Sequence, residues 1–270
     1  MEIKPLNHVS FSKIMTCFLK AFENYYVPMP TTHAYYKKRW AAAKVDYELS
    51  FGAFDKKELV GFILHAVDER EGNKIAFNTG TGVIPAYRGK KLVKTIYEFA
   101  LPILKANGIN QSKLEVITAN KAAIRAYERI GFQIDRTFNC YNGPFEIPVK
   151  FNVKLNEKAL KDIDLTSLVH SATYSWDNQN ASLQMNAHCY FEVIEDSKAI
   201  GYFIIDTSSN YIVQWEAESN SWLKLMAGIH QISGAVKINN VDTRLNEKIA
   251  VLKQIKIPLV INQYEMQLPL

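Results

Sequence analysis

The 270-residue sequence predicts an α/β fold, in the wide sense that includes α+β, with a mixed and largely antiparallel sheet flanked by helices. Strand-like runs within residues 49–67 lie close enough to pair as a hairpin, and from residue 74 onward strand-like and amphipathic helical stretches alternate. Part of this order recurs in residues 190–267. A second, smaller α/β domain is therefore expected after the first.

Two helices are predicted near the N-terminus. Apolar residues recur at helical spacing through residues 11–22. The run Tyr25–Pro30 contains two prolines and interrupts that pattern. A second helical stretch follows at residues 35–43.

Three strands and a longer helix are predicted next. Residues 49–54 and 58–67 are joined by a short polar turn, and residues 74–84 continue as a third strand. Pro102 falls late in the helix that follows, where we expect it to kink or end the helix. The apolar face of that helix consists of Leu92, Ile96, Phe99, Ala100 and Ile103.

The alternation continues to about residue 140. Residues 112–118 are strand-like, residues 120–130 are helical, and a strand begins after Gly131. Pro144 and Pro148 mark a boundary near residue 145. We therefore expect one domain at residues 1–145 and another at residues 146–270, both of ordinary size.

The second half repeats part of the pattern of the first. The sequence Leu59–Ile63 has a counterpart in Ala199–Phe203, each within a predicted hairpin. This favours an internal duplication, although hairpins of this kind also recur in unrelated proteins. The strand-like stretches are residues 190–194, 199–206, 211–216, 235–241 and 259–267, and the helical ones are residues 222–232 and 244–255.

Composition narrows the class of protein. Hydrophobic residues make up 48% of the chain, and the net charge of +5 is spread along it, so neither nucleic acid nor a membrane is an expected partner. The N-terminus lacks the basic-then-apolar order of a secretory signal. Cys17, Cys140 and Cys189 lie far apart, which predicts neither a metal site nor a disulfide framework and favours a cytoplasmic setting.

A basic turn connects a predicted strand to a predicted helix at residues 82–92. It contains Gly89 together with the cations Arg88, Lys90 and Lys91. Backbone N–H groups at the start of a helix have no intrahelical partner, and the helix dipole favours an anion there. The turn therefore indicates a diphosphate site, although any lysine-rich strand-to-helix turn would look similar.

A second segment forms the helix of residues 120–130. Asn120 begins it, and Tyr127 lies about two turns further on. Gly131 follows the helix end, where a left-handed conformation is common.

Taken together, these two segments resemble the Gcn5-related N-acetyltransferase (GNAT) family. In that family a Val-x-Pro-x-Tyr-Arg-Gly turn grips the pyrophosphate of acetyl-coenzyme A. The resemblance covers roughly residues 1–140, and it implies an N-acetyltransferase that uses acetyl-CoA and no metal. The downstream family pattern Asn-x-x-Ala-x-x-x-Tyr-x-x-x-Gly-Phe is matched at Asn120, Ala123, Tyr127, Gly131 and Phe132.

The resemblance also implies a role for each part of the site. The strand ending at residue 84 would splay from its neighbour, so that its backbone could hydrogen-bond the pantetheine arm. Tyr127 would protonate the departing thiolate as a general acid, and Asn120 would hydrogen-bond along the arm. The residues that the resemblance implies for coenzyme binding are Thr81, Gly82, Val83, Arg88, Gly89, Lys90, Lys91, Leu92, Val93, Asn120 and Tyr127.

Two positions depart from the family pattern. Lys91 and Val93 stand where the family has small residues. Glycine lets a backbone approach phosphate closely, so its absence would weaken binding or shift the turn, unless Lys91 compensates by its charge.

The general base is not marked by the sequence. Glu115 is the first candidate, although its alternation with apolar neighbours fits a solvent-facing side chain equally well. His65, on a predicted strand, is more typical of a structural histidine, and Glu23 and His33 flank an aromatic segment. The aromatic residues Tyr25, Tyr26, Tyr35, Tyr36 and Trp40 could line an acceptor pocket or belong to the core, and the core is favoured.

The second half has an acidic counterpart to the basic turn. Residues 214–220 contain Glu216 and Glu218 and no Arg-Gly, so they would repel a pyrophosphate. We hypothesise a degenerate acetyltransferase-like domain that buttresses the first and helps to complete the acceptor cleft. Full activity and stability of an isolated N-terminal half would contradict this.

The function expected from the sequence is transfer of an acetyl group from acetyl-CoA to a primary amine of a small molecule, peptide or protein, by direct attack in a ternary complex. A non-catalytic acyl-CoA-binding protein of the same fold is the alternative, and Tyr127 argues against it. The sequence leaves open a homodimer through sheet edges.

Overall fold

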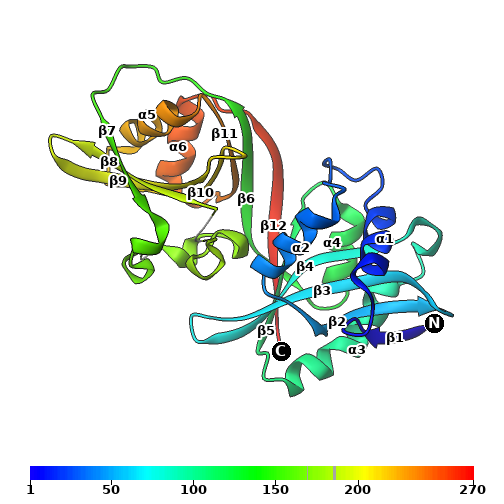
Figure 1. The fold of residues 1–270 in the computed structure, drawn as a ribbon. Coiled ribbons are helices and arrows are strands. Elements are labelled where there is room, and N and C mark those ends of the chain that lie inside the picture. Colours follow the sequence, from blue (N-terminus) through cyan, green and yellow to red (C-terminus); the bar gives the residue numbers. More distant parts are fainter. Residues whose placement is uncertain (169, 185–186) are drawn as a thin grey trace. The chain divides into compact units, whose positions relative to one another are not determined.

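The computed structural model describes residues 1–168, 170–184 and 187–270, which form two compact units (Figure 1). The first unit comprises residues 1–135 together with residues 264–270, and the second comprises residues 136–263. The division falls within β6 (Gln133–Pro144) and β12 (Leu259–Pro269). The chain therefore divides before residue 145, and its last strand returns to the first unit.

The first unit is organised around a sheet with the hydrogen-bonded order β1-β2-β3-β4-β5-β12. Strands β1 to β4 pair antiparallel, whereas β4 and β5 run parallel, as the pattern of hairpin then alternation predicts. Its elements are β1 (Glu2–Pro5), α1 (Phe11–Ala21), α2 (His33–Ala42), β2 (Val45–Asp55), β3 (Glu58–Arg70), β4 (Asn73–Val83), the 3-10 turn η1 (Pro85–Tyr87), α3 (Leu92–Ala106), β5 (Gln111–Ile117) and α4 (Lys121–Glu128).

Helices cover both faces of this sheet. Successive side chains of a strand point to opposite faces. Phe62 and Leu64 of β3 accordingly contact α1 and α2, whereas Ile63, between them, contacts the core under α3 and α4. The alternation fixes which face of the sheet carries Tyr127, the α4 residue that belongs to the same core as Ile63.

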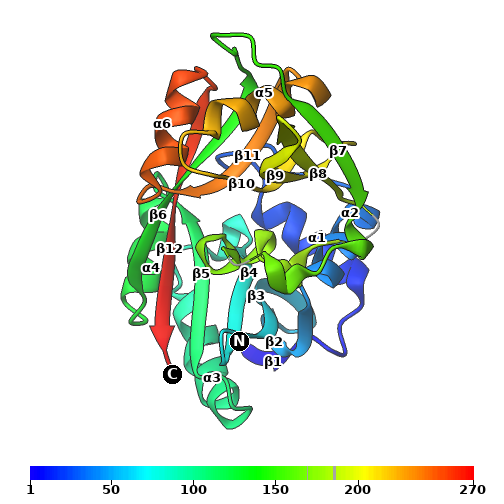
Figure 2. The ribbon, with the colours of Figure 1, turned by 90° about the vertical axis from the view of Figure 1, so that its left-hand side faces the viewer.

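The C-terminal end of β12 completes the sheet of the first unit, running beside β5 in the opposite direction (Figure 2). The Leu270 amide donates to the Asn110 carbonyl at 3.0 Å, and the Gln111 and Gln267 side chains are hydrogen-bonded at 2.9 Å. Met266 is 0% exposed within the core under α3 and α4. The sheet that carries the first site thus depends on the end of the chain.

The second unit repeats this plan with the order β12-β6-β11-β10-β9-β8-β7. Its α5 and α6 pack against Phe203, Ile205 and Trp215, whereas the opposite face of the sheet, with Ile204 and Val213, is covered by 3-10 turns within residues 160–183. Its elements are β7 (Lys154–Ala159), η2 (Leu160–Asp162), η3 (Leu165–Ser167), η4 (Ser171–Thr173), η5 (Trp176–Asn178), η6 (Asn180–Ser182), β8 (Cys189–Glu195), β9 (Lys198–Asp206), β10 (Tyr211–Ala217), α5 (Trp222–Ile232), β11 (Ala235–Asp242) and α6 (Asn246–Gln254).

The predicted fold class and the predicted helices are confirmed. Of the two effects expected of Pro102, a kink or an end of the helix, the structure contradicts the end. Helix α3 continues past Pro102 to Ala106. Pro102 removes a single donor, and burial of Ala100 and Leu104 in the adjoining turns keeps the last turn helical. Short strands β1 and β7 and the 3-10 turns are not among the predicted elements.

Candidate active site

Strands β4 and β5 separate at the position where the resemblance predicts a splay. Their paired residues run from Ile75 and Gln111 to Asn78 and Leu114, and no later pair joins these two described strands. On its other edge, β4 stays paired with β3 as far as Val83. The backbone of Thr81–Val83 therefore has one hydrogen-bonding edge turned toward the gap between β4 and β5.

The basic turn follows directly from this splayed end. Gly89 has φ +78° and Lys91, which caps α3, has φ +59°, so the chain turns sharply before the helix. The N–H groups of the first helical turn point out of the helix without intrahelical partners. The Lys90 ammonium lies 4.4 Å from the centre of the Tyr87 ring, and the Tyr87 hydroxyl donates to Asp55 at 2.6 Å. These contacts anchor the turn to the sheet.

Arg88 contacts two backbone carbonyls. Its Nε donates to the Val83 carbonyl at 3.2 Å, and its Nη2 donates to the Ala21 carbonyl at 3.0 Å. The guanidinium thereby ties the end of β4 to the end of α1. Arg88, Lys90 and Lys91 are all exposed, and Lys90 and Lys91 directly precede the start of α3.

Gly82 lets α1 approach the splayed strand. A Cβ at this position would lie 2.7 Å from the Ala21 Cβ and 2.7 Å from the Phe62 ring, closer than side-chain atoms normally come. The glycine is thus required by packing as well as by its place beside the gap.

Tyr127 lies under the splay, with 7% of its surface exposed. Burial raises the pKa of its phenol to about 12, and hydrogen bonds with the Thr81 and Asn78 side chains oppose that rise only in part. The phenol therefore keeps its proton at neutral pH and can act as a proton donor.

Asn78 connects Tyr127 to a buried polar cluster that sequence patterns did not reveal. Its Nδ2 donates to the Tyr97 hydroxyl at 2.8 Å and to Thr81 Oγ1 at 2.7 Å, and its Oδ1 accepts the Gly80 amide at 3.1 Å. The sequence did offer one sign of this cluster, an asparagine inside an otherwise apolar strand. A buried side-chain amide needs hydrogen-bond partners, so polar neighbours could have been expected.

Asn120 and the chain after α1 lie together at the start of α4. The Asn120 side chain caps the helix by accepting the Ala123 amide at 3.2 Å. It also hydrogen-bonds the Tyr25 phenol, whose pKa burial raises. The Tyr26 hydroxyl donates to the Ala119 carbonyl at 3.5 Å. Tyr25 and Tyr26 thus border the site. The core position favoured from the sequence is right for Tyr36 and Trp40 and wrong for Tyr26 and Tyr35, which are exposed.

The candidate general bases differ in where their side chains lie. Glu115 lies on β5 between Leu114 and Val116, which are buried in the core that contains Tyr127, so the strand alternation turns Glu115 to the opposite face. Glu23 and His33 are exposed on the surface. None of these positions tests the predicted catalytic role of Glu115, which stays a prediction.

His65 is structural in its surroundings. It is 0% exposed, and its Nδ1 lies 2.6 Å from the Leu49 carbonyl, to which it donates as the neutral tautomer. Burial lowers its pKa to about 4, although the Leu49 hydrogen bond and the charge of Asp46 oppose the shift. A buried, neutral imidazole is not placed to take a proton from an incoming amine.

The depressed pKa of His65 gives a stability prediction. The unfolded chain takes up a proton near pH 6.5 and the folded chain only near pH 4, so stability is complete above pH 6.5 and falls as the pH drops toward 4. A shift of this size corresponds to about 3 kcal/mol. His65→Gln should flatten the loss of thermal stability between pH 7 and pH 4.5. An unchanged profile in the variant would contradict a buried neutral His65.

No group of three or more His, Cys, Asp or Glu side chains that could hold a metal occurs among the described residues. No helix in the described part of the chain is long and apolar enough to cross a membrane.

Comparison with known proteins identifies the first half. Residues 14–132 match the model of the acetyltransferase (GNAT) family. The first half of the chain belongs to the GNAT acetyltransferase family. This GNAT segment is 24% identical to N-alpha-acetyltransferase 30 of Schizosaccharomyces pombe over 133 residues, which are 49% of this chain and 83% of that protein.

Solved structures extend the GNAT likeness of fold to the whole chain. A tandem GNAT protein from the clavulanic acid biosynthesis pathway has a TM-score of 0.69 at 11% identity, covering 99% of this chain and 98% of that one. A GCN5-related N-acetyltransferase from Sphaerobacter thermophilus has a TM-score of 0.67 at 8% identity, covering 99% and 95%. The fold of the chain is thus a tandem GNAT architecture, with the match to the GNAT family model in its first half, and the duplication expected from Leu59–Ile63 and Ala199–Phe203 is a duplication of fold.

Proposed function

We propose that the first unit transfers an acetyl group from acetyl-CoA to a primary amine by direct attack in a ternary complex. The observation that carries the proposal is the splay of β4 from β5 above the protonated phenol of Tyr127. A gap with a strand edge that β5 leaves unpaired on one side and a proton donor beneath suits a thioester whose carbonyl must be polarised and whose thiolate must be protonated.

The residues around the gap fit an acyl-CoA. The outer edge of Thr81–Val83 offers backbone donors and acceptors to the pantetheine amides. The turn with Gly89 and Lys91 in left-handed conformations brings N–H groups to the start of α3, beside Leu92 and Val93, where a pyrophosphate would bind. Lys90 and Lys91 supply the opposite charge, so Lys91 compensates for the small residue that the family has there.

The chemistry assigned to this chain is a balanced acyl transfer. The amine nitrogen forms a bond to the acetyl carbon, and the bond from carbon to sulfur breaks. The amine loses a proton to Glu115, directly or through water, and the sulfur gains a proton from Tyr127. Glu115 and Tyr127 lie on opposite faces of the sheet at the splay, which allows the amine and the leaving thiol to occupy opposite sides of the acetyl group.

The acceptor is a primary amine of a small molecule, peptide or protein. Tyr25 and Tyr26, which border the start of α4, are the side chains that we assign to its approach. Peptide α-amines are the first acceptors to try, because the relative from Schizosaccharomyces pombe is named as an N-alpha-acetyltransferase.

Charge reversal in the turn tests coenzyme binding. Acetyl-CoA at 100 times its Kd should stabilise the folded protein by about 2.7 kcal/mol and raise its Tm. Lys90→Glu together with Lys91→Glu should weaken binding at least about tenfold, since two attractions to the diphosphate become repulsions. The matched control is Lys37→Glu with Lys38→Glu, an equal charge change on exposed residues of α2. The proposal fails if acetyl-CoA gives no Tm shift in the unmodified protein.

A further inference from the structure

The second unit has its own splay, in the same place in the fold as the first. Strands β10 and β11 pair in parallel only at Tyr211 with Lys237 and Ile212 with Ile238. Beyond these residues β10 remains paired with β9 on its other edge, as far as Ala217. The backbone that follows Val213 therefore has one edge turned away from β9, as Thr81–Val83 has in the first unit.

The pairing of residues between neighbouring strands shows which positions of the two splays correspond. Gly61 of β3 pairs with Val83, and its counterpart Gly201 of β9 pairs with Ala217. Two residues earlier on each splayed strand, Ile63 pairs with Thr81 and Phe203 pairs with Trp215. Trp215 thus occupies the place of Thr81, and Glu216 the place of Gly82. The backbone of Trp215 is the second unit's equivalent of a pantetheine-binding group.

The side chain of Tyr174, in the same unit, already hydrogen-bonds the backbone of Trp215. The Trp215 amide donates to the Tyr174 hydroxyl at 2.9 Å, and the hydroxyl lies 2.9 Å from the Trp215 carbonyl and 2.6 Å from Glu216 Oε1. One phenol therefore takes the donor and the acceptor that an amide of a pantetheine arm would use. Tyr174 is 6% exposed.

The chain around Tyr174 is held along β10. Gln214 Nε2 donates to the Asn178 carbonyl at 2.7 Å and to Asn180 Oδ1 at 2.9 Å. The Tyr211 hydroxyl donates to Asn178 Oδ1 at 2.6 Å. Residues 171–182, which we call the groove segment, thus contact β10 at Tyr211, Gln214 and Trp215.

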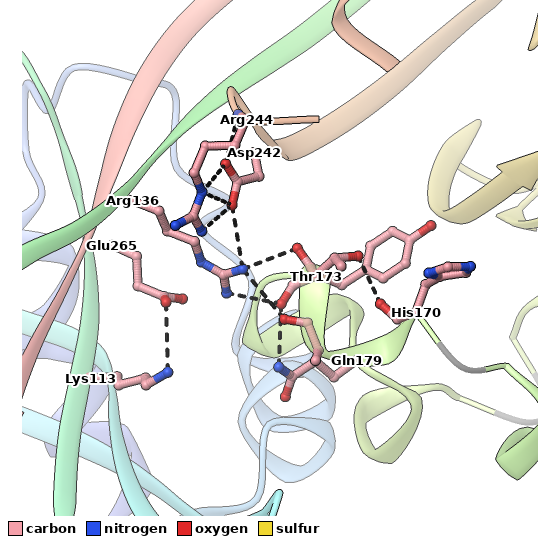
Figure 3. A network of polar contacts seen from close by, with 10 residues as sticks. Lys113, Arg136, His170, Thr173, Gln179, Asp242, Arg244 and Glu265 are labelled. Carbon is pink, nitrogen blue, oxygen red and sulfur yellow. Dashed lines mark hydrogen bonds and ion pairs between the residues drawn. The ribbon is translucent and has the colours of Figure 1, made fainter. Parts of the chain in front are cut away.

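An arginine of β6 holds the groove segment from another direction (Figure 3). Arg136 Nη1 donates to the Thr173 carbonyl at 3.1 Å, and Nη2 donates to the Tyr174 carbonyl at 3.2 Å. Its guanidinium also lies 3.8 Å from Asp242, which Arg244 contacts at 2.6 Å. Burial alone would raise the pKa of Asp242, but the hydrogen bonds of Arg244 and the charge of Arg136 lower it, so a carboxylate faces the arginine.

A buried ion pair closes the remaining space. Lys248 of α6 is 4% exposed and donates to Glu216 Oε1 at 2.7 Å and to the Tyr174 hydroxyl at 3.0 Å, while its ammonium lies 4.5 Å from the Tyr174 ring centre. The cavity beside Tyr174, Trp215 and Lys248 has a volume of about 10 Å³, room for about one water molecule. A pantetheine arm does not fit in this space.

The second unit also lacks a phosphate-binding turn of the first unit's kind. Residues 218–221 connect β10 to α5, whereas residues 84–91 connect β4 to α3. The short connection carries Glu218, paired with Lys198 at 2.6 Å, and no arginine or lysine.

We propose that the groove segment permanently fills the coenzyme groove of the second unit, with Tyr174 in the place of the pantetheine arm, so that each chain binds a single coenzyme molecule, in the first unit. This inference rests on the proposed function, because it takes the splay of the first unit as a coenzyme site. The second unit is then a structural copy whose groove is occupied from within.

Binding stoichiometry separates this inference from the proposed function. Calorimetric titration of the full chain with coenzyme A should give one site, and Lys90→Glu with Lys91→Glu should weaken that site at least tenfold. Two sites per chain, or one site that the double substitution does not affect, would overturn the inference and leave a coenzyme-binding protein. No binding to the unmodified chain would instead refute the proposed function.

Hydrogen exchange tests the role of Tyr174 directly. The Trp215 amide should exchange slowly in the unmodified protein, and at least tenfold faster in Tyr174→Phe, because the variant lacks only the hydroxyl that accepts it. Tyr190→Phe, a buried tyrosine on β8, is the matched control and should leave the exchange of Trp215 unchanged. Fast exchange of Trp215 in the unmodified protein, or equal rates in the protein and Tyr174→Phe, would show that the groove is not filled as proposed.

Discussion

Removing residues 264–270 is expected to unfold the first unit and abolish coenzyme binding, although these residues lie far in sequence from every predicted site residue. The segment supplies the strand next to β5, and without it β5 becomes an open edge. It also supplies Met266, a fully buried residue of the core that contains Tyr127. Loss of the strand should therefore disrupt the active site in two ways, by exposing the edge of β5 and by removing Met266 from the core.

A single substitution tests the same dependence in a chain that still folds. Met266→Ala should lower the free energy of unfolding of the first unit by about 2–5 kcal/mol, because it leaves a cavity in a packed core. Val260→Ser is the matched control on the same strand, since Val260 is 55% exposed and should tolerate the change. Thermal unfolding with and without acetyl-CoA measures both effects. Equal Tm values for Met266→Ala and the unmodified protein would contradict the dependence.

The paths of β6 and β12 determine where the two compact units divide. Strand β6 ends at Pro144, and the division near residue 145 was inferred from Pro144 and Pro148. Yet the compact units divide within β6 and β12, because each strand continues from one unit into the other. Which strands pair over more than a hundred residues depends on tertiary packing, and neither propensity nor turn chemistry encodes it locally.

Local sequence signals were sufficient to predict helix α4, which carries Tyr127. Asn120 caps α4 and Gly131 has φ +112°, as the residue type at each position predicts. The splay of β4 from β5 also lies where the GNAT resemblance implied it, after Asn78. These features depend on residues close in sequence, so a motif is enough to place them.

The polar environment of Tyr127 could not be predicted in the same way. Asn78, Tyr97 and Thr81 come from two strand positions and a helix, and only the folded sheet brings them into hydrogen-bonding distance. The groove segment has no hydrophobic period at all and is held by single hydrogen bonds, such as those of Asn178 and Asn180. The two carbonyl partners of Arg88 likewise come from residues that only the folded chain brings together.

Replacing Tyr127 by phenylalanine is expected to lower kcat by about 100-fold or more, with little change in the Kd of acetyl-CoA. The substitution removes a proton donor and keeps the ring that packs against Phe132 at 5.8 Å and Tyr97 at 6.4 Å. Because the lost proton is needed only as the thiolate departs, the deficit belongs to the transition state. Tyr47→Phe, on β2, is the matched control and should retain full activity.

The leaving group gives a sharper test of the same role. An acetyl thioester of a more acidic thiol needs less help from a proton donor, so the deficit of Tyr127→Phe should shrink with that substrate. An equal deficit with both thioesters would mean that Tyr127 serves packing alone. Burial raises the pKa of Tyr127 to about 12, so the donor form persists below that pH and the rate should show no loss from its ionisation up to pH 10. An alkaline decline centred below pH 10 that disappears in Tyr127→Phe would show that the phenol ionises more readily than its burial allows.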